Sequence, residues 1–298
     1  MVIKQQIDTM RERITDEIFL ALGLSKTGLL RRLFGKLFYL PTHRFVEIIS
    51  HADEAVGEGG MSNGCRSVVH DFSIQLQVRG AEQIPSDGSL LVVSNHPGAY
   101  DSVCLASSVP RQDLKIMVWE IPFYRILPNA SRWFLYATGD TTGRMLALKN
   151  AIRHLRNGGA VLQFGSGLIE PDPGIFPHTE ESLKNWSPSI EIMLRKASET
   201  CLVLAVASGV LLHKFANHPF TRLRRELIAR RRLAEFMQVI QQLLIPGSVE
   251  VKAYLSFAPP VSVGELASES KDGSLMPVIL GYARDLLAEH LKAYHITV

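Results

Sequence analysis

The strongest indication of architecture is an apolar run that passes directly into polar residues, Leu90-Leu91-Val92-Val93-Ser94-Asn95-His96-Pro97-Gly98-Ala99-Tyr100-Asp101. Residues 90–94 are apolar without alternation, which predicts a short strand buried on both faces. Pro97 and Gly98 then predict a turn. Ligands bind where the strands of an open α/β sheet end, so we expect the functional site just after Ser94.

Further strands and helices alternate along the chain. Helices are expected at 144–156, at about 222–244 and after Pro277, and Asn157-Gly158-Gly159 supplies a stop for the first of them. This order predicts an α/β fold with a largely parallel central sheet flanked by helices, preceded by an N-terminal helical extension. The other expected strands lie at 72–78, 115–119, 133–136, 160–164, 202–207 and 249–257.

The N-terminal part of the chain has a different pattern. The first 56 residues or so read as helical, and the glycine-rich stretch 57–64 breaks this pattern. We therefore expect a helical extension at 1–64, with a potential membrane-surface segment, and an α/β domain at 65–298. Residues 1–16 lack the apolar middle of a secretion signal, and no run reaches the roughly 18 apolar residues of a membrane span. A cytoplasmic location, peripheral to the membrane, is the expectation.

Composition excludes several classes of protein. The chain has 298 residues, of which 46% are hydrophobic and only 20% charged, so a disordered or coiled-coil protein is excluded. Its three cysteines are too few and too isolated for a disulfide scaffold or a zinc ribbon. A reducing compartment is therefore favoured, and no metal site is expected.

The net charge of +3 conceals two basic clusters. Residues 26–46 carry five basic residues and no acid, and residues 214–235 carry seven basic residues against two glutamates, so the rest of the chain is net acidic. Such clusters favour an anionic surface or ligand as partner. Each also fits a solvated helix face, and the second fits the phosphates of coenzyme A or of a carrier protein. Few aromatic residues interleave with them, which argues against nucleic acid.

His96 and Asp101 are the residues that suggest chemistry. A turn through Pro97 and Gly98 would let the carboxylate accept a hydrogen bond from one imidazole nitrogen and leave the other as a proton acceptor. This is the base and its orienting group without a protein nucleophile, which suits a substrate that brings its own hydroxyl. The alternative is that His96 merely ends a strand and Asp101 caps the next helix.

The order of these segments resembles the glycerolipid acyltransferase superfamily. Asn95-His96, followed by Asp101, is similar to its first motif, and Phe164-Gly165-Ser166-Gly167 is similar to its third, usually Phe-Pro-Glu-Gly. The resemblance covers roughly residues 70–215. It implies that His96 is a general base oriented by Asp101, that the donor is acyl-CoA or acyl-carrier protein, and that the acceptor is a glycerolipid-type hydroxyl. No cofactor beyond the acyl thioester is implied.

The sequence departs from the family pattern at the acceptor side. Gly165-Ser166 replaces the Pro-Glu of the third motif, so the acceptor carboxylate is missing, and Arg144 is the nearest cation to the position of the second motif's arginine. The candidates for acceptor or oxyanion binding are Asn95, Arg144, Gly165, Ser166 and Gly167. The backbone N–H groups of the loop after Phe164 could hold an oxyanion. An uncharged lipid alcohol or an amine also fits such a site.

Two other functions remain open on the sequence. The same His-Asp pair could activate water, which would make the protein an acyl thioesterase or another hydrolase. The chain could also be a lipid-binding relative that kept the fold without the chemistry.

Overall fold

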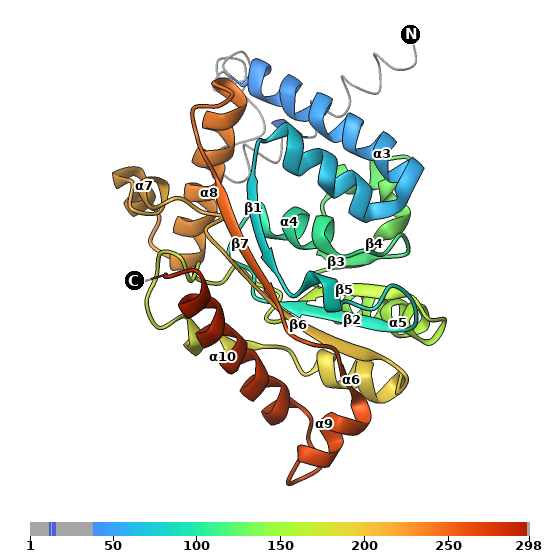
Figure 1. Ribbon diagram of the computed structural model, residues 1–298. Helices are drawn as coiled ribbons and strands as arrows, with labels where there is room; N and C mark the ends of the chain where they lie inside the picture. Colours follow the sequence, from blue (N-terminus) through green and yellow to red (C-terminus); the bar gives the residue numbers. More distant parts are fainter. Residues whose placement is uncertain (1–11, 13, 16–37, 297–298) are drawn as a thin grey trace.

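The computed structural model describes residues 12, 14–15 and 38–296, and these form a sheet covered by helices on both faces (Figure 1). The strands are β1 (Gln75–Arg79), β2 (Leu90–Ser94), β3 (Lys115–Trp119), β4 (Phe134–Ala137), β5 (Ala160–Phe164), β6 (Cys201–Ser208), β7 (Lys252–Phe257) and β8 (Val261–Ser262). The α-helices are α3 (Tyr39–Asp71), α4 (Asp101–Ser108), α5 (Thr141–Arg156), α6 (Ser189–Lys196), α7 (His213–Ala216), α8 (Leu227–Leu244), α9 (Val263–Glu269) and α10 (Met276–Ala293). Short 3₁₀ segments are η1 (Ala81–Gln83), η2 (Pro122–Ile126), η3 (Ala130–Trp133), η4 (Thr179–Asn185) and η5 (Pro219–Leu223).

The strand order is β1-β7-β6-β2-β5-β3-β4, and β8 pairs with β6. β2, β5, β6, β3 and β4 run parallel, whereas β7 and β8 are antiparallel to β6. Ser94 is in register with both Phe164 and Ala205, so β2, β5 and β6 end at the same edge. The largely parallel α/β fold expected from the sequence is confirmed.

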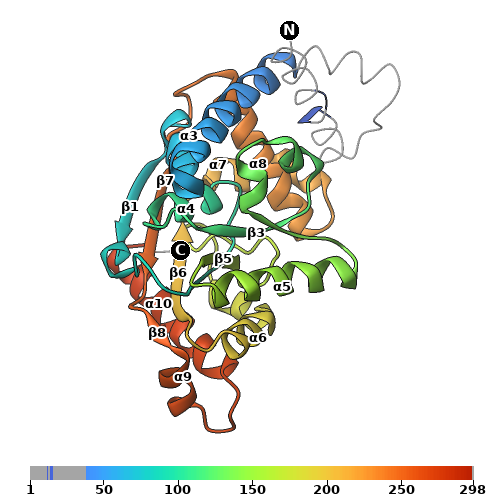
Figure 2. The ribbon, with the colours of Figure 1, turned by 90° about the vertical axis from the view of Figure 1, so that its right-hand side faces the viewer.

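Alternate residues of the central strands pack into two separate cores. Leu90 and Val92 face a core built with α3, α4 and α8, while Leu91 and Val93 face one built with α5, α6 and α10. All five residues of β2 are buried, which explains the apolar run that predicted it. Figure 2 shows the sheet edge-on between α3 and α8 on one side and α5, α6 and α10 on the other.

The glycine-rich stretch interrupts the helix as expected, but a second helical segment follows it before the first strand. α3 bends at Gly59 and Gly60, which have non-helical backbone angles, and then continues to Asp71. Gly60 has a φ of +76°, and a Cβ there would lie 2.2 Å from the carbonyl oxygen of Gln112, so only glycine fits this close approach. The boundary drawn at 64/65 therefore falls inside the second half of α3.

The continuation of α3 also shifts the first strand. The strand predicted at 72–78 is observed at Gln75–Arg79, although Phe72 and Ile74 are buried as the pattern required. The helix predicted from 222 begins at Leu227, after the 3₁₀ segment η5. In the described part of the chain, no helix combines the length and apolarity needed to cross a bilayer.

Candidate active site

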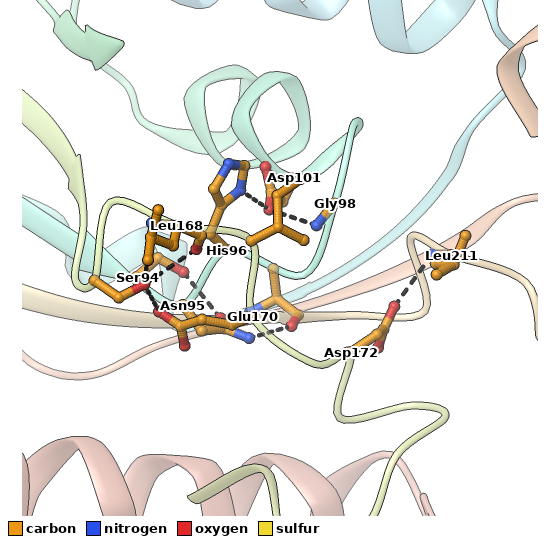
Figure 3. A network of polar contacts seen from close by, with 12 residues as sticks. Ser94, Asn95, His96, Gly98, Asp101, Leu168, Glu170, Asp172 and Leu211 are labelled. Carbon is orange, nitrogen blue, oxygen red and sulfur yellow. Dashed lines mark hydrogen bonds and ion pairs between the residues drawn. The ribbon is translucent and has the colours of Figure 1, made fainter. Parts of the chain in front are cut away.

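The turn after β2 brings His96 and Asp101 together. His96 Nδ1 lies 2.7 Å from Asp101 Oδ2, and the same oxygen accepts a hydrogen bond from the Gly98 backbone N–H at 3.0 Å (Figure 3). A carboxylate bonded to Nδ1 favours the tautomer that carries its proton there, which leaves the lone pair on Nε2. The arrangement expected from the five-residue spacing is present.

Burial differs sharply between the two members of this pair. The Asp101 side chain is fully buried, while that of His96 is 26% exposed. The imidazole stacks on the Phe164 ring, with 4.2 Å between centroids and 23° between planes. The ring is therefore held from two sides, by a hydrogen bond and by an aromatic face, and keeps one edge open.

The surroundings of His96 are rich in carboxyl groups. Burial alone would lower the pKa of His96, but the Asp101 carboxylate, with smaller contributions from Glu235 and Glu170, raises it above its ordinary value. A base with a raised pKa is stronger once it is deprotonated. These carboxyl groups also stabilise the imidazolium that proton abstraction would create.

Asn95 connects β2 to β6. Its Nδ2 donates to the Ala207 carbonyl at 2.9 Å, and its Oδ1 accepts the Ala207 N–H at 2.8 Å. The side chain is buried, so both ends of the amide are committed to the neighbouring strand. Asn95 thus fixes the end of β2 to β6, one residue before His96.

The loop after β5 lies beside this turn, as the register of β2 and β5 requires. The Gly165 N–H donates to Ser94 O at 2.8 Å and the Gly167 N–H to Phe164 O at 3.2 Å. These two amides are therefore engaged within the protein rather than directed at a substrate oxygen. A Cβ at Gly165 would lie 2.2 Å from the Trp186 ring, so the indole occupies the place of any side chain there.

Glu170 is a site residue that the sequence reasoning missed. Ser166 Oγ donates to Glu170 Oε1 at 2.6 Å, Ser182 Oγ donates to Oε2 at 3.0 Å, and the Glu170 N–H donates to His96 O at 2.7 Å. The chain thus lacks a carboxylate at position 166, but the carboxylate of Glu170, four residues later, is hydrogen-bonded to Ser166. Burial raises the pKa of Glu170, against the opposing effect of the two serine hydroxyls.

Glu235 and Arg231 of α8 are also close to the site. A Cβ added to Gly98 would lie 3.3 Å from the Glu235 carboxyl carbon, so this carboxyl packs against the His96 turn. Glu235 Oε1 is buried and has no hydrogen-bond partner among the described residues. Burial raises the pKa of Glu235 to about 8, an effect that His96 opposes. Arg231 Nη1 donates to Ile169 O at 3.3 Å, next to Glu170.

No feature of the linear sequence indicates that α8 lies next to His96. Glu235 belongs to a cluster dominated by arginines, more than a hundred residues further along the chain. Glu170 offered a weak signal, an acidic residue shortly after the third motif.

Arg144 is remote from these residues. It lies exposed on the first turn of α5, which follows β4, and β5 and β3 separate β4 from β2. No hydrogen bond or ion pair between described residues joins it to the His96 turn or to the 165–167 loop. The structure therefore gathers His96, Asp101, Asn95 and the 165–167 loop but leaves Arg144 apart.

An apolar cavity borders the turn that follows His96. Its volume is about 300 Å³, and Ala99, Tyr100, Ser102 and Val103 of the turn and α4 form part of its wall. The remaining wall comes mostly from apolar side chains of α3, β3, η2 and β4. Metal ligands do not gather anywhere in residues 38–296: no three histidine, cysteine or acidic side chains are grouped to hold an ion.

Comparison with known proteins identifies the class. Residues 75–208 match the sequence profile of the Acyltransferase family. Residues 75–208 therefore carry an acyltransferase domain, which agrees with the resemblance of the motifs to the glycerolipid acyltransferase superfamily.

A solved structure of the same fold is the 1-acyl-sn-glycerophosphate (LPA) acyltransferase PlsC from Thermotoga maritima. The match has a TM-score of 0.50 and 18% identity, and it covers 89% of this chain and 96% of that one. The search of curated proteins gives no match.

Proposed function

We propose that the protein transfers a fatty acyl group from an acyl thioester, acyl-CoA or acyl-carrier protein, to a hydroxyl of a glycerolipid-type acceptor. The observation that carries this proposal is the 2.7 Å His96–Asp101 hydrogen bond beside the apolar cavity at the carboxyl edge of the sheet. The acyltransferase domain supports the reaction type. The reaction needs no metal and no cofactor other than the thioester.

In the proposed step, His96 Nε2 accepts the proton of the acceptor hydroxyl. The acceptor oxygen forms a bond to the thioester carbonyl carbon, the carbon–sulfur bond breaks, and the proton passes from His96 to the leaving thiolate. Asp101 keeps the imidazole in the correct tautomer and stabilises its protonated form. Proton transfer of this kind contributes about 10²–10⁴-fold in rate.

The apolar cavity supports an acyl chain as the donated group. Its wall is continuous with Ala99 and Tyr100, so a chain lying in it would begin next to the histidine. Such cavities take up apolar ligands and leave orientation to a few polar groups at their mouth. His96, three residues before Ala99, is the polar group of the turn that borders this cavity.

The Ser166–Glu170 pair supports a hydroxyl-bearing acceptor. A carboxyl group that holds a serine hydroxyl at 2.6 Å can equally receive hydrogen bonds from a polyol. The structural relative is named as a lysophosphatidate acyltransferase, and we propose an acceptor of that type.

An anionic membrane surface is proposed as the place of reaction, on the cytoplasmic side. Phe220, Leu223 and Leu227 are 62%, 78% and 64% exposed, and Arg222 and Arg225 lie between them. Exposed apolar side chains among arginines favour contact with anionic lipid. The earlier basic cluster lies outside the described residues except for Arg44, which instead donates to the Leu243 and Leu244 carbonyls.

The decisive assay is product analysis with labelled acyl-CoA and acyl-carrier protein, with and without lysophosphatidate or glycerol 3-phosphate. We expect labelled acyl ester that depends on the acceptor. Free fatty acid as the sole product, at a rate unaffected by acceptors, would show a thioesterase instead. Lipid binding without any turnover would show a non-catalytic relative.

A further inference from the structure

A second cavity, separate from the apolar one, adjoins the other side of the site. Its volume is about 560 Å³, and it lies between the loop that follows Glu170, η4, η5 and the first turns of α8. Three arginines line it, Arg222, Arg230 and Arg231, together with the polar side chains of His178, Asn217 and Thr221. The carboxylate in its wall is Glu181, which pairs with Lys184 at 3.9 Å. The cavity is therefore strongly cationic.

None of the three arginines forms an ion pair with a carboxylate of the described residues. Within the described residues, no Asp or Glu oxygen comes within 4.0 Å of Arg222, Arg230 or Arg231. Arg230 Nε and Arg231 Nη1 donate only to the carbonyls of Arg224 and Ile169, at 2.7 and 3.3 Å. Both side chains are half-buried. Guanidinium groups that are partly withdrawn from water and form no direct ion pair favour an anion that supplies several acceptor oxygens.

Arg231 connects this cavity to the histidine. Its acceptor, Ile169, precedes Glu170, whose N–H donates to His96 O at 2.7 Å. Glu170 and Glu235, which face both Arg231 and His96, have pKa values raised by burial, so they neutralise Arg231 less than ordinary carboxylates would. An anion bound to Arg231 would therefore be connected to His96 through Ile169 and Glu170.

We propose that this cavity binds a phosphate group of a substrate through Arg222, Arg230 and Arg231. Phosphate fits because arginine forks bind its oxygens in pairs. The three arginines belong to η5 and α8, outside the family-matched segment 75–208. They would provide the cationic binding site that the altered second and third motifs do not provide. The role of this site in the reaction rests on the proposed acyl transfer, whereas the binding of phosphate does not depend on that proposal.

Calorimetry tests the binding directly, with glycerol 3-phosphate and coenzyme A as probes. For the double variant R222Q/R230Q we expect at least tenfold weaker binding of one probe. Binding should be partly restored in R222K/R230K. The control variant R284Q, which removes an exposed arginine of α10, should bind both probes like the wild type. Loss for glycerol 3-phosphate assigns the acceptor phosphate, and loss for coenzyme A assigns the donor phosphates. Unchanged binding of both probes, or equal weakening in R284Q, would overturn the proposal.

Kinetics then connects the site to the reaction. If the acceptor phosphate binds here, R222Q/R230Q raises KM at least tenfold for lysophosphatidate and not for monoacylglycerol. If the donor binds here, KM rises for acyl-CoA and not for the corresponding acyl-pantetheine. Failure of the acyl transfer itself would appear as absence of product in the wild type, while the calorimetric result would still decide the phosphate site. Unchanged thermal unfolding of the variants excludes misfolding as the cause.

Discussion

At the scale of single residues, the pair His96–Asp101 combines an exposed edge with a fully buried anchor. The exposed edge of the imidazole can meet a substrate, and the buried carboxylate cannot exchange its partner for water. Both properties follow from the five-residue spacing, because Asp101 begins α4 and is held in the core while Pro97 and Gly98 turn the chain back.

The first prediction concerns these two residues. His96→Ala should lower kcat/KM by about 10²–10⁴-fold, because the reaction loses its base. Asp101→Asn should lower it as well, because the neutral amide neither fixes the tautomer nor stabilises the imidazolium. Steady-state rates with a saturating acceptor measure both effects. His70→Ala, which removes an exposed imidazole at the end of α3, is the control, and near-wild-type activity in His96→Ala would refute the mechanism.

A second prediction concerns pH. Because the pKa of His96 is raised, the imidazole is protonated and inactive at low pH, and kcat/KM should rise with pH to a midpoint above the ordinary histidine value of about 6.5. Glu235→Gln removes a carboxyl group that favours the protonated imidazole to the extent that it is ionised, so the acid limb should move to lower pH. The groups facing His96 are Asp101, Glu170 and Glu235, with Arg231 and Arg232 near the last.

The pH–rate profile of Glu235→Gln is compared with that of Glu289→Gln, an exposed change on α10. The latter should leave the midpoint in place. A midpoint that moves upward in Glu235→Gln, or that does not move, would show that Glu235 has no electrostatic effect on His96.

Residues close in sequence were predictable, and residues joined only by the fold were not. The His96–Asp101 contact spans five residues and follows from turn chemistry. The contact of Glu235 with Gly98 depends on how α8 crosses the end of the sheet. No periodicity or spacing in a single sequence encodes that crossing, so the sequence indicates α8 only as a helix that carries a basic cluster.

At the scale of secondary-structure elements, the ends of β5 and β6 are joined by a buried carboxylate. Asp172, in the loop after β5, accepts the backbone N–H groups of Gly174, Gly209 and Leu211 at 2.7, 2.9 and 3.1 Å. Two of these donors follow β6. The side chain therefore holds the two loops that border the arginine-lined cavity, and Leu211 forms part of that cavity's wall.

The third prediction follows from this link. Asp172→Ala would leave three backbone donors without their acceptor, and we expect it to lower the free energy of unfolding by about 2–4 kcal/mol. Asp172→Asn keeps one acceptor oxygen and should lose less. Urea unfolding followed by circular dichroism measures the difference, with Asp285→Ala on the exposed face of α10 as the control. An Asp172→Ala variant as stable as the control would show that the loops hold each other without it.

Elements with a uniform environment were predicted almost to the residue. β2, β3 and β5 coincide with the expected segments. β2 and β5 are buried on both faces, and such strands have an apolar sequence with sharp ends. The helix break expected at 57–64 occurs at Gly59 and Gly60, but the sequence did not indicate the helical segment that follows it. Glycine breaks a helix in isolation, but here Gly60 makes a bend that lets the chain approach Gln112, after which the helix resumes.

At the scale of the whole molecule, the carboxyl edge of the sheet gathers the reactive histidine, the cationic cavity and a group of exposed apolar side chains. Phe220, Leu223 and Leu227 stand on η5 and the start of α8, the same elements that carry the cavity's arginines. The net charge gives no sign of this arrangement, because the acidic remainder of the chain offsets the basic clusters. If this edge rests on a membrane, a lipid acceptor can reach His96 without leaving the bilayer surface.

The last prediction tests this orientation. Replacing Phe220 and Leu223 by glutamate removes apolar area and adds negative charge, so binding to vesicles of phosphatidylglycerol and phosphatidylcholine should fall at least tenfold, since burying one such side chain contributes about 1.5–3 kcal/mol. Co-sedimentation at low and high salt measures it, and salt should weaken wild-type binding because the arginines contribute. Ile192→Glu, an equally drastic change at an exposed position on α6, should bind like the wild type. Equal loss in both proteins, or binding unaffected by F220E/L223E, would place the membrane contact on another face.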